Sequence, residues 1–121
     1  MSKELRILSF EARREKSANL LSENPGKIPV VMLKGKNSKL ELEKHLYLVS
    51  NQLTLAEFLY SIRKSIRIDK SEGFYLFVSD RLPPLNLHML QLYQRSSEDD
   101  GFLYITYTTQ EDKGCDLNLV L

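Results

Sequence analysis

The stretch that decides the fold is TLAEFLYSIRKSI, residues 54–66. It opens with Thr54 and, three residues later, Glu57, a pattern in which each side chain accepts a hydrogen bond from the other residue's backbone amide at a helix N-terminus. Apolar residues then recur at the spacing of one helix face, at Leu55, Phe58, Leu59, Ile62 and Ile66. The stretch therefore predicts an amphipathic helix with one face buried in the core.

Segments rich in β-formers flank this helix on both sides. Residues 27–33 and 46–49 precede it and predict an antiparallel hairpin with a polar connection. Residues 73–78 and 102–108 follow it, separated by a Pro-rich turn and a short helix over residues 89–93. Two strands, a crossing helix and two more strands predict an α+β fold of the β-grasp type, with a four-stranded mixed sheet packed on one main helix.

The two ends of the chain lie outside this pattern. Residues 9–24 are mostly good helix formers that end at Asn24-Pro25-Gly26, and residues 3–8 could add a helical turn before them. We expect residues 1–25 to form an N-terminal helical extension packed on the core. Residues 26–108 would form that core, and residues 109–121 a flexible tail.

The strand at residues 27–33 is apolar on both faces. Alternate side chains, starting from Ile28 and from Pro29, point to opposite sides of the sheet, and only one side can face the main helix. The N-terminal helix must cover the other side, and we expect it to cover that side only in part. An apolar gap should then remain beside an exposed edge of this strand, where an extended peptide could add.

The composition is that of an ordinary globular domain with little net charge. Seventeen basic and sixteen acidic residues leave +1, which is too little to attract nucleic acid over the whole surface. Because Cys115 is the single cysteine, we expect no internal disulfide and a reducing, cytoplasmic compartment. Residues 1–16 do not resemble a secretory signal, and no apolar run approaches the roughly 18 residues of a membrane span.

The sequence contains no recognisable catalytic or metal-binding motif. His45 and His88 have no local partner that would make either a catalytic base, and Asp99-Asp100 does not have calcium-loop spacing. We therefore expect no enzymatic activity, no metal and no cofactor. A thiol-dependent enzyme using Cys115 is the alternative from another class, and it would be excluded if blocking the thiol changed no function.

Several runs in the chain follow one another in an order shared with a known family. They are Ser9-Phe10-Glu11 with Arg13, Lys27-Ile28-Pro29-Val30, Tyr47-Leu48-Val49, Phe58 with Ile62-Arg63-Lys64, Leu82-Pro83-Pro84, Gln91-Leu92-Tyr93, and Asp99-Asp100-Gly101-Phe102-Leu103-Tyr104. Together they resemble the autophagy ubiquitin-like modifiers, the family of the GABA-receptor-associated protein and the microtubule-associated light chain three. The resemblance covers roughly residues 9–114.

The resemblance implies a monomeric ubiquitin-like core that docks partners. A cysteine protease would expose Gly114, and separate conjugation enzymes would join it to phosphatidylethanolamine on autophagosomal and other vesicle membranes. Receptors would bind through aromatic-x-x-aliphatic motifs. The resemblance implies a first pocket lined by Lys16, Leu20, Pro29, Val31, Leu48 and Phe102, with Leu46 beside it, and a second lined by Tyr47, Val49, Leu53, Phe58 and Ile62. The alternative is that most of these side chains simply fill the core.

The chain departs from the family pattern at three positions. The family usually has a cation where this chain has Leu46, which predicts a weaker preference for acidic residues flanking the motif. It usually has an arginine at the position of Ser65 and an aromatic residue at that of Lys113. Lys113 directly precedes Gly114, where the processing protease of the family would cut, so the chain could have lost its processing signal. An unconjugated ubiquitin-like adaptor that binds the same kind of peptide is therefore the alternative function.

Overall fold

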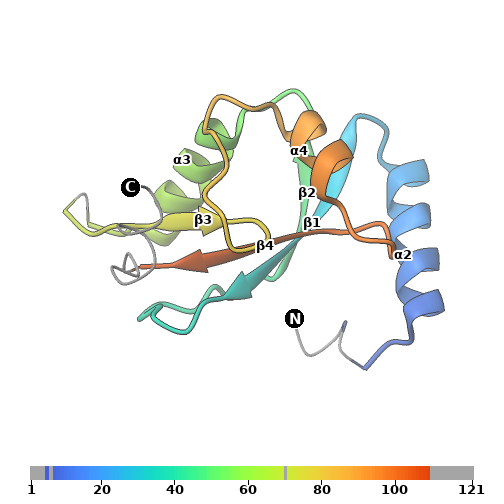
Figure 1. The fold of residues 1–121 in the computed structure, drawn as a ribbon, viewed down its shortest axis with the longest axis horizontal. Coiled ribbons are helices and arrows are strands. Elements are labelled where there is room, and N and C mark those ends of the chain that lie inside the picture. Colours follow the sequence, from blue (N-terminus) through green and yellow to red (C-terminus); the bar gives the residue numbers. More distant parts are fainter. Residues whose placement is uncertain (1–4, 6, 70, 110–121) are drawn as a thin grey trace.

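The structure is a computed structural model that describes residues 5, 7–69 and 71–109. Within these residues the elements follow in the order α2 (Phe10–Glu23), β1 (Lys27–Lys34), β2 (Leu46–Ser50), α3 (Leu55–Ile66), β3 (Tyr75–Phe77), α4 (Met89–Ser96) and β4 (Leu103–Thr108). The four strands form one sheet in the order β2-β1-β4-β3 (Figure 1). The expected α+β architecture, a four-stranded mixed sheet on a main helix, is confirmed.

Strand β1 lies in the centre of the sheet. It pairs antiparallel with β2, where Val30 faces Tyr47, and parallel with β4, where Val30 faces Leu103. The expectation that β1 offers an exposed edge is therefore wrong, because both of its hydrogen-bonding sides are occupied. The edges of the sheet are β2 and β3.

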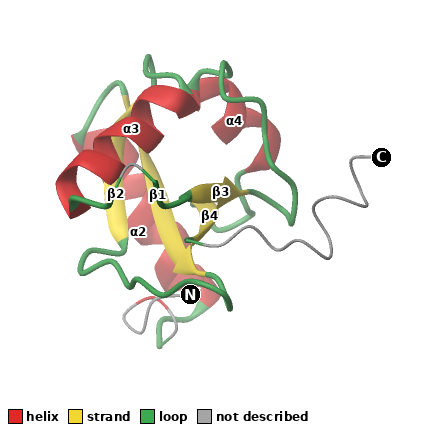
Figure 2. Ribbon diagram, turned by 90° about the vertical axis from the view of Figure 1, so that its left-hand side faces the viewer, coloured by secondary structure: helices red, strands yellow, loops and turns green. Residues whose placement is uncertain are grey.

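Helix α3 covers one face of the sheet, as its sequence predicts. The Thr54 hydroxyl accepts a hydrogen bond from the Glu57 amide at 3.2 Å, and the Glu57 carboxylate accepts one from the Thr54 amide at 2.9 Å. Helix α4 lies on the same side (Figure 2) and contributes Met89 and Leu92 to the shared core. This main core also contains alternate residues of β1, namely Ile28, Val30 and Met32.

A second, smaller apolar cluster lies on the opposite face. It contains Leu5, Val31 and Phe102, and α2 is the helix that packs on this side of β1. The predicted division of β1 into two sets of inward-pointing side chains is therefore confirmed. The cover on this face comes from α2 and from the short segment before it, to which Leu5 belongs.

Some element boundaries differ from the sequence-based expectation. Strand β3 is shorter because Val78 pairs with Arg81 across a tight turn, whereas α4 continues beyond residue 93 to Ser96. Thr109 was expected in the flexible tail but is buried, and its hydroxyl accepts a hydrogen bond from the Lys39 amide at 2.9 Å. The core therefore extends at least to residue 109. Gly114 and Cys115 lie outside the described residues.

No helix in the described part of the chain is both long enough and apolar enough to cross a membrane.

Candidate functional site

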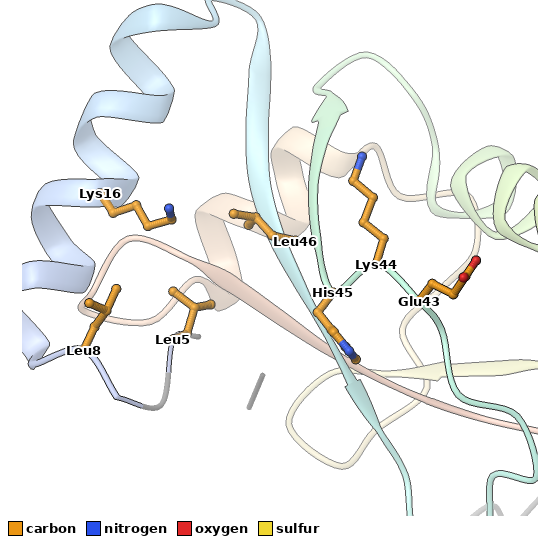
Figure 3. A pocket seen from close by; sticks show the side chains of 7 residues that line it. All are labelled: Leu5, Leu8, Lys16, Glu43, Lys44, His45 and Leu46. Atoms are coloured by element: carbon orange, nitrogen blue, oxygen red, sulfur yellow. The ribbon is translucent and has the colours of Figure 1, made fainter. Parts of the chain in front are cut away.

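A pocket of about 500 Å³ lies between α2 and the start of edge strand β2 (Figure 3). It is lined by Leu5, Leu8, Lys16, Glu43, Lys44, His45 and Leu46. In Figure 3, Leu5, Leu8 and Lys16 face Leu46 across the pocket, and Glu43 lies further from α2. The pocket therefore joins three segments that are distant in the sequence: the N-terminal segment, α2, and the residues entering β2.

The structure places only part of the expected first pocket on this surface. Lys16 and Leu46 line it, but Val31 and Phe102 are 0% exposed and Pro29 is also fully buried. Leu5 belongs to the same cluster as Val31 and Phe102. The expectation that Pro29, Val31 and Phe102 line an open pocket is therefore corrected, because all three are buried, and Val31 and Phe102 pack with Leu5, which itself lines the pocket.

The remaining two residues of that expected set lie on the same face. Leu20 is partly buried and packs against the Val31 cluster, and Leu48 is half-buried and sits opposite Pro29 in the sheet. Leu5 and Leu8, which also line the pocket, were not among the site residues predicted from the sequence. Their apolar character in a charged N-terminal segment is the signal that could have indicated a buried role.

The second expected set is brought together on the other face of β2. Val49, Phe58 and Ile62 are buried in the main core, and Tyr47 and Leu53 pack against it while remaining partly exposed. The rings of Tyr47 and Phe58 meet edge to face, with centroids 6.1 Å apart. Burial, with a smaller contribution from Tyr107, raises the pKa of Tyr47, so its hydroxyl stays neutral at physiological pH. Tyr47 and Leu53 are thus the residues of this set that a ligand could touch.

Two lysines stand at the pocket despite the missing cation at position 46. Lys16 reaches the pocket from α2, and Lys44 lines it from the segment entering β2, with its ammonium 5.2 Å from the centre of the Tyr47 ring. Glu43 supplies one opposing charge. Position 46 itself carries no cation, and the weaker preference for acidic flanking residues stays a prediction. Lys44, two residues earlier in the chain, is a lining lysine that the sequence did not indicate.

The wall formed by α2 is fixed through the buried carboxylate of Asp100. Its Oδ2 accepts hydrogen bonds from Arg13 Nε at 3.0 Å and from the Tyr104 hydroxyl at 2.5 Å. Its Oδ1 accepts one from the Phe102 amide at 3.0 Å, and its backbone carbonyl accepts one from the Ser17 hydroxyl at 2.6 Å. These bonds tie α2 to β4, so the pocket is preformed rather than assembled on binding.

The pKa of Tyr104, which belongs to the same hydrogen-bond network, is strongly raised. Burial is the main cause that raises the pKa of Tyr104 well above its ordinary value, and its hydrogen bond and proximity to Asp100 add to the effect. The phenol therefore stays protonated and keeps donating to the carboxylate across the physiological range. None of these groups forms a catalytic arrangement, and the described residues contain no cluster of three or more His, Cys, Asp or Glu side chains that could hold a metal ion.

Solved structures of two protozoan proteins share the fold. Trypanosoma brucei ATG8 superimposes with a TM-score of 0.81 at 28% identity, covering 89% of this chain and 94% of its own. Plasmodium falciparum Atg8, solved in complex with a Plasmodium falciparum Atg3 peptide, superimposes with a TM-score of 0.80 at 28% identity. The match covers 92% of this chain and 98% of the Plasmodium chain.

Comparison of sequences gives the same result. Autophagy-related protein 8 of Candida glabrata is 38% identical over 106 residues, covering 87% of this chain and 90% of the relative. Its counterpart in Kluyveromyces lactis is 35% identical over 108 residues, covering 88% and 87%. The family model described as autophagy protein Atg8, ubiquitin-like, matches residues 12–114. This chain belongs to the Atg8 family of ubiquitin-like autophagy proteins.

Proposed function

We propose that this chain is a ubiquitin-like modifier that is conjugated through Gly114 to phosphatidylethanolamine on autophagosomal membranes. There it recruits receptors that carry an aromatic residue, two variable residues and then Leu, Ile or Val. It acts by docking partners and performs no catalysis itself. The observation that carries the binding half of this proposal is the preformed pocket beside the free edge of β2.

The geometry of β2 fits such a motif. An extended peptide can pair with an edge strand through its backbone, and residues three apart in an extended chain point to opposite faces of the sheet about 10 Å apart. The pocket beside Leu46 lies on the α2 face, and the partly exposed Tyr47 and Leu53 lie on the α3 face. The aromatic side chain would enter the pocket while the aliphatic one packs on Tyr47 and Leu53.

The known peptide complex of a relative supports the choice of occupant. Plasmodium falciparum Atg8 was solved with a peptide of Plasmodium falciparum Atg3. We extend this to the present chain and propose that its partners include the processing protease and the conjugation enzymes as well as receptors. Short linear motifs of this kind bind with dissociation constants on the order of micromolar.

Leu46→Asp is the substitution that tests the binding site. The pocket wall would then carry a charge, and affinity for a Trp-x-x-Leu peptide measured by calorimetry should fall at least about tenfold. Leu82→Asp is the matched control, because Leu82 is 49% exposed and does not line the pocket. Unchanged affinity in a folded Leu46→Asp protein would contradict this placement. Val31→Asp is unsuitable, because Val31 is fully buried and the variant would unfold.

Conjugation requires a test of its own. Gly114 has no side chain, so a protease or an activating enzyme can close around the backbone there, and cleavage before Cys115 would make Gly114 the terminus. Gly114→Ala should leave folding and peptide binding intact but prevent processing and attachment to liposomes that contain phosphatidylethanolamine. Intact mass after incubation with the protease and conjugation enzymes gives the readout.

The second candidate function is an unconjugated cytoplasmic adaptor that binds the same kind of peptide. Lys113 favours it, because the family usually has an aromatic residue at this position. A species in starved cells that still ends at Leu121, with no lipidated form in the membrane fraction, would support this candidate over the conjugated modifier.

A further inference from the structure

The end of β1 and the connection that follows it carry a local concentration of positive charge. Residues 34–39, here called the basic loop, contain Lys34, Lys36 and Lys39 and no acidic residue. All three lysines are exposed, and none of them forms a salt bridge with another described residue. The net charge of +1 for the whole chain therefore conceals an uneven distribution.

The basic loop is held beside the point where the chain leaves the fold. The Gly35 amide donates to the Tyr107 carbonyl at 2.7 Å, and the Lys39 amide donates to the Thr109 hydroxyl at 2.9 Å. Thr109 is buried and is the last described residue. In Figure 1 the basic loop and the end of β4 lie at one end of the molecule, and α2 lies at the other. An anchor attached after Thr109 therefore holds the basic loop close to itself.

The C-terminal end of α3 meets the basic loop at the same end of the molecule. Arg67 and Lys39 line a second pocket, of about 400 Å³, together with Asp69 and Glu72, whose carboxylates balance these two cations. Arg63 donates to the backbone carbonyls of Asp69 and Glu72 at 3.2 and 3.1 Å, and not to their carboxylates. The excess of positive charge at this end therefore comes from the basic loop and Arg63 rather than from the pocket.

We propose that the basic loop binds the anionic headgroups of the membrane to which the chain is anchored through its tail. This inference rests on the proposed conjugation through Gly114 and adds a lipid preference to it. Gly114 is five positions after Thr109, a span of at most about 17 Å in an extended chain. Lysines at the base of so short a tether can reach the headgroups, where each contributes about fivefold to membrane partitioning. The α2 end of the molecule would then point away from the membrane (Figure 1).

Cys115 allows this inference to be tested on the full chain without conjugation enzymes. It is the single cysteine and directly follows Gly114, so a lipid with a maleimide headgroup couples to its thiol next to the proposed anchor. The rate of coupling is measured with phosphatidylcholine vesicles that contain this lipid, with and without added phosphatidylserine. The ratio of the two rates reports the attraction of the protein to the anionic surface, and comparison between proteins cancels any effect of that surface on the thiol itself.

Two triple variants separate the basic loop from the net charge. The loop variant removes the three exposed cations of the basic loop: Lys34→Gln, Lys36→Gln and Lys39→Gln. The control variant removes three exposed cations from α2, the start of β1 and α4: Arg14→Gln, Lys27→Gln and Arg95→Gln. Both variants have the same net charge, and circular dichroism checks that both are folded. At low salt the rate ratio of the wild-type protein should exceed that of the loop variant by at least about fivefold, and the control variant should keep the wild-type ratio. The difference should disappear at high salt.

Two results would overturn the inference. Equal rate ratios for the wild-type protein and the loop variant would do so, and this result is also expected if Glu111 and Asp112 of the tail neutralise the loop in place of lipid. An equal loss in the control variant would show that net charge alone attracts the protein. Coupling through Cys115 proceeds whether or not Gly114 is conjugated. If the conjugation enzymes leave Gly114 unmodified, the proposed conjugation fails, while the rate ratios still decide whether the basic loop binds anionic lipid.

Discussion

Gly101→Ala tests how tightly the loop before β4 is held against α2. Gly101 has a φ of +89°, and a Cβ placed there would lie 2.1 Å from Ser17 Oγ and 2.9 Å from Ser17 Cβ. Ser17 is 2% exposed, and its hydroxyl donates to the Asp100 carbonyl at 2.6 Å. Ser17 therefore cannot move away from the added methyl group without losing that buried hydrogen bond.

The magnitude follows from comparison with Gly26. That glycine also has a positive φ, +81°, but nothing lies within 4 Å of a Cβ built on it. Gly26→Ala should therefore lower the free energy of unfolding only through the backbone conformation, by about 1 kcal/mol. Gly101→Ala adds overpacking, about 1–3 kcal/mol, and the loss of one buried hydrogen bond, about 1 kcal/mol, for a total of about 3–5 kcal/mol.

Urea unfolding followed by circular dichroism measures these differences, since the chain has no tryptophan to serve as a fluorescent reporter. The double variant Ser17→Ala/Gly101→Ala should be more stable than the sum of the single effects predicts, by at least about 1 kcal/mol, because Ser17→Ala removes the oxygen that clashes. A Gly101→Ala protein within about 0.5 kcal/mol of Gly26→Ala would refute the argument, as would strict additivity.

Three further predictions concern pH, helix capping and charge. Because the pKa of Tyr104 is raised above its ordinary 10.0, the unfolded chain loses this proton first as pH rises, so the free energy of unfolding should fall above about pH 10. Tyr104→Phe should reduce the fall measured by urea titrations at about pH 9 and about pH 11. A fall of the same size in the variant would contradict this prediction. Thr54→Ala should lower the free energy of unfolding by about 1 kcal/mol and Thr54→Ser by much less, and equal losses would show that the α3 cap does not contribute through its hydroxyl. Lys16→Gln and Lys44→Gln should each weaken binding of a peptide with acidic flanks by up to about 1 kcal/mol at low salt, and by less at high salt. Glu43→Gln should strengthen binding of the same peptide. Calorimetry at two salt concentrations checks the sign of each change.

Local sequence patterns were sufficient to predict most of the fold. The Thr54–Glu57 capping pattern and the apolar spacing after it predicted α3, and the alternation along β1 predicted its two buried faces. The position of β1 within the sheet was not predicted. It depends on parallel pairing with β4, which comes much later in the chain. The two-sided apolar character of β1, typical of interior strands, was nevertheless a usable signal that it lies centrally.

The site could be predicted only in part. Lys16 and Leu46 were expected near the pocket, and they line it. Leu5 could not be placed, because a single apolar residue in a short charged segment has no periodicity that would assign it to a face. Lys44 was not predicted at the site, because among the residues entering β2 only the one directly before Tyr47 was considered as a cation, whereas the structure brings the Lys44 ammonium to 5.2 Å from the centre of the Tyr47 ring.

The two edge strands of the sheet are not equally suited to binding a four-residue aromatic-x-x-aliphatic motif. Edge strand β3 spans only Tyr75–Phe77, and the tight Val78–Arg81 turn follows it, so a four-residue segment cannot pair along its length. Edge strand β2 has five residues, with the pocket on one face and Tyr47 on the other. Side chains three apart on an added strand point to opposite faces, so only an edge with a binding surface on both faces can hold both anchors. Strand β2 meets this condition, because the pocket lies on its α2 face and the partly exposed Tyr47 lies on its α3 face.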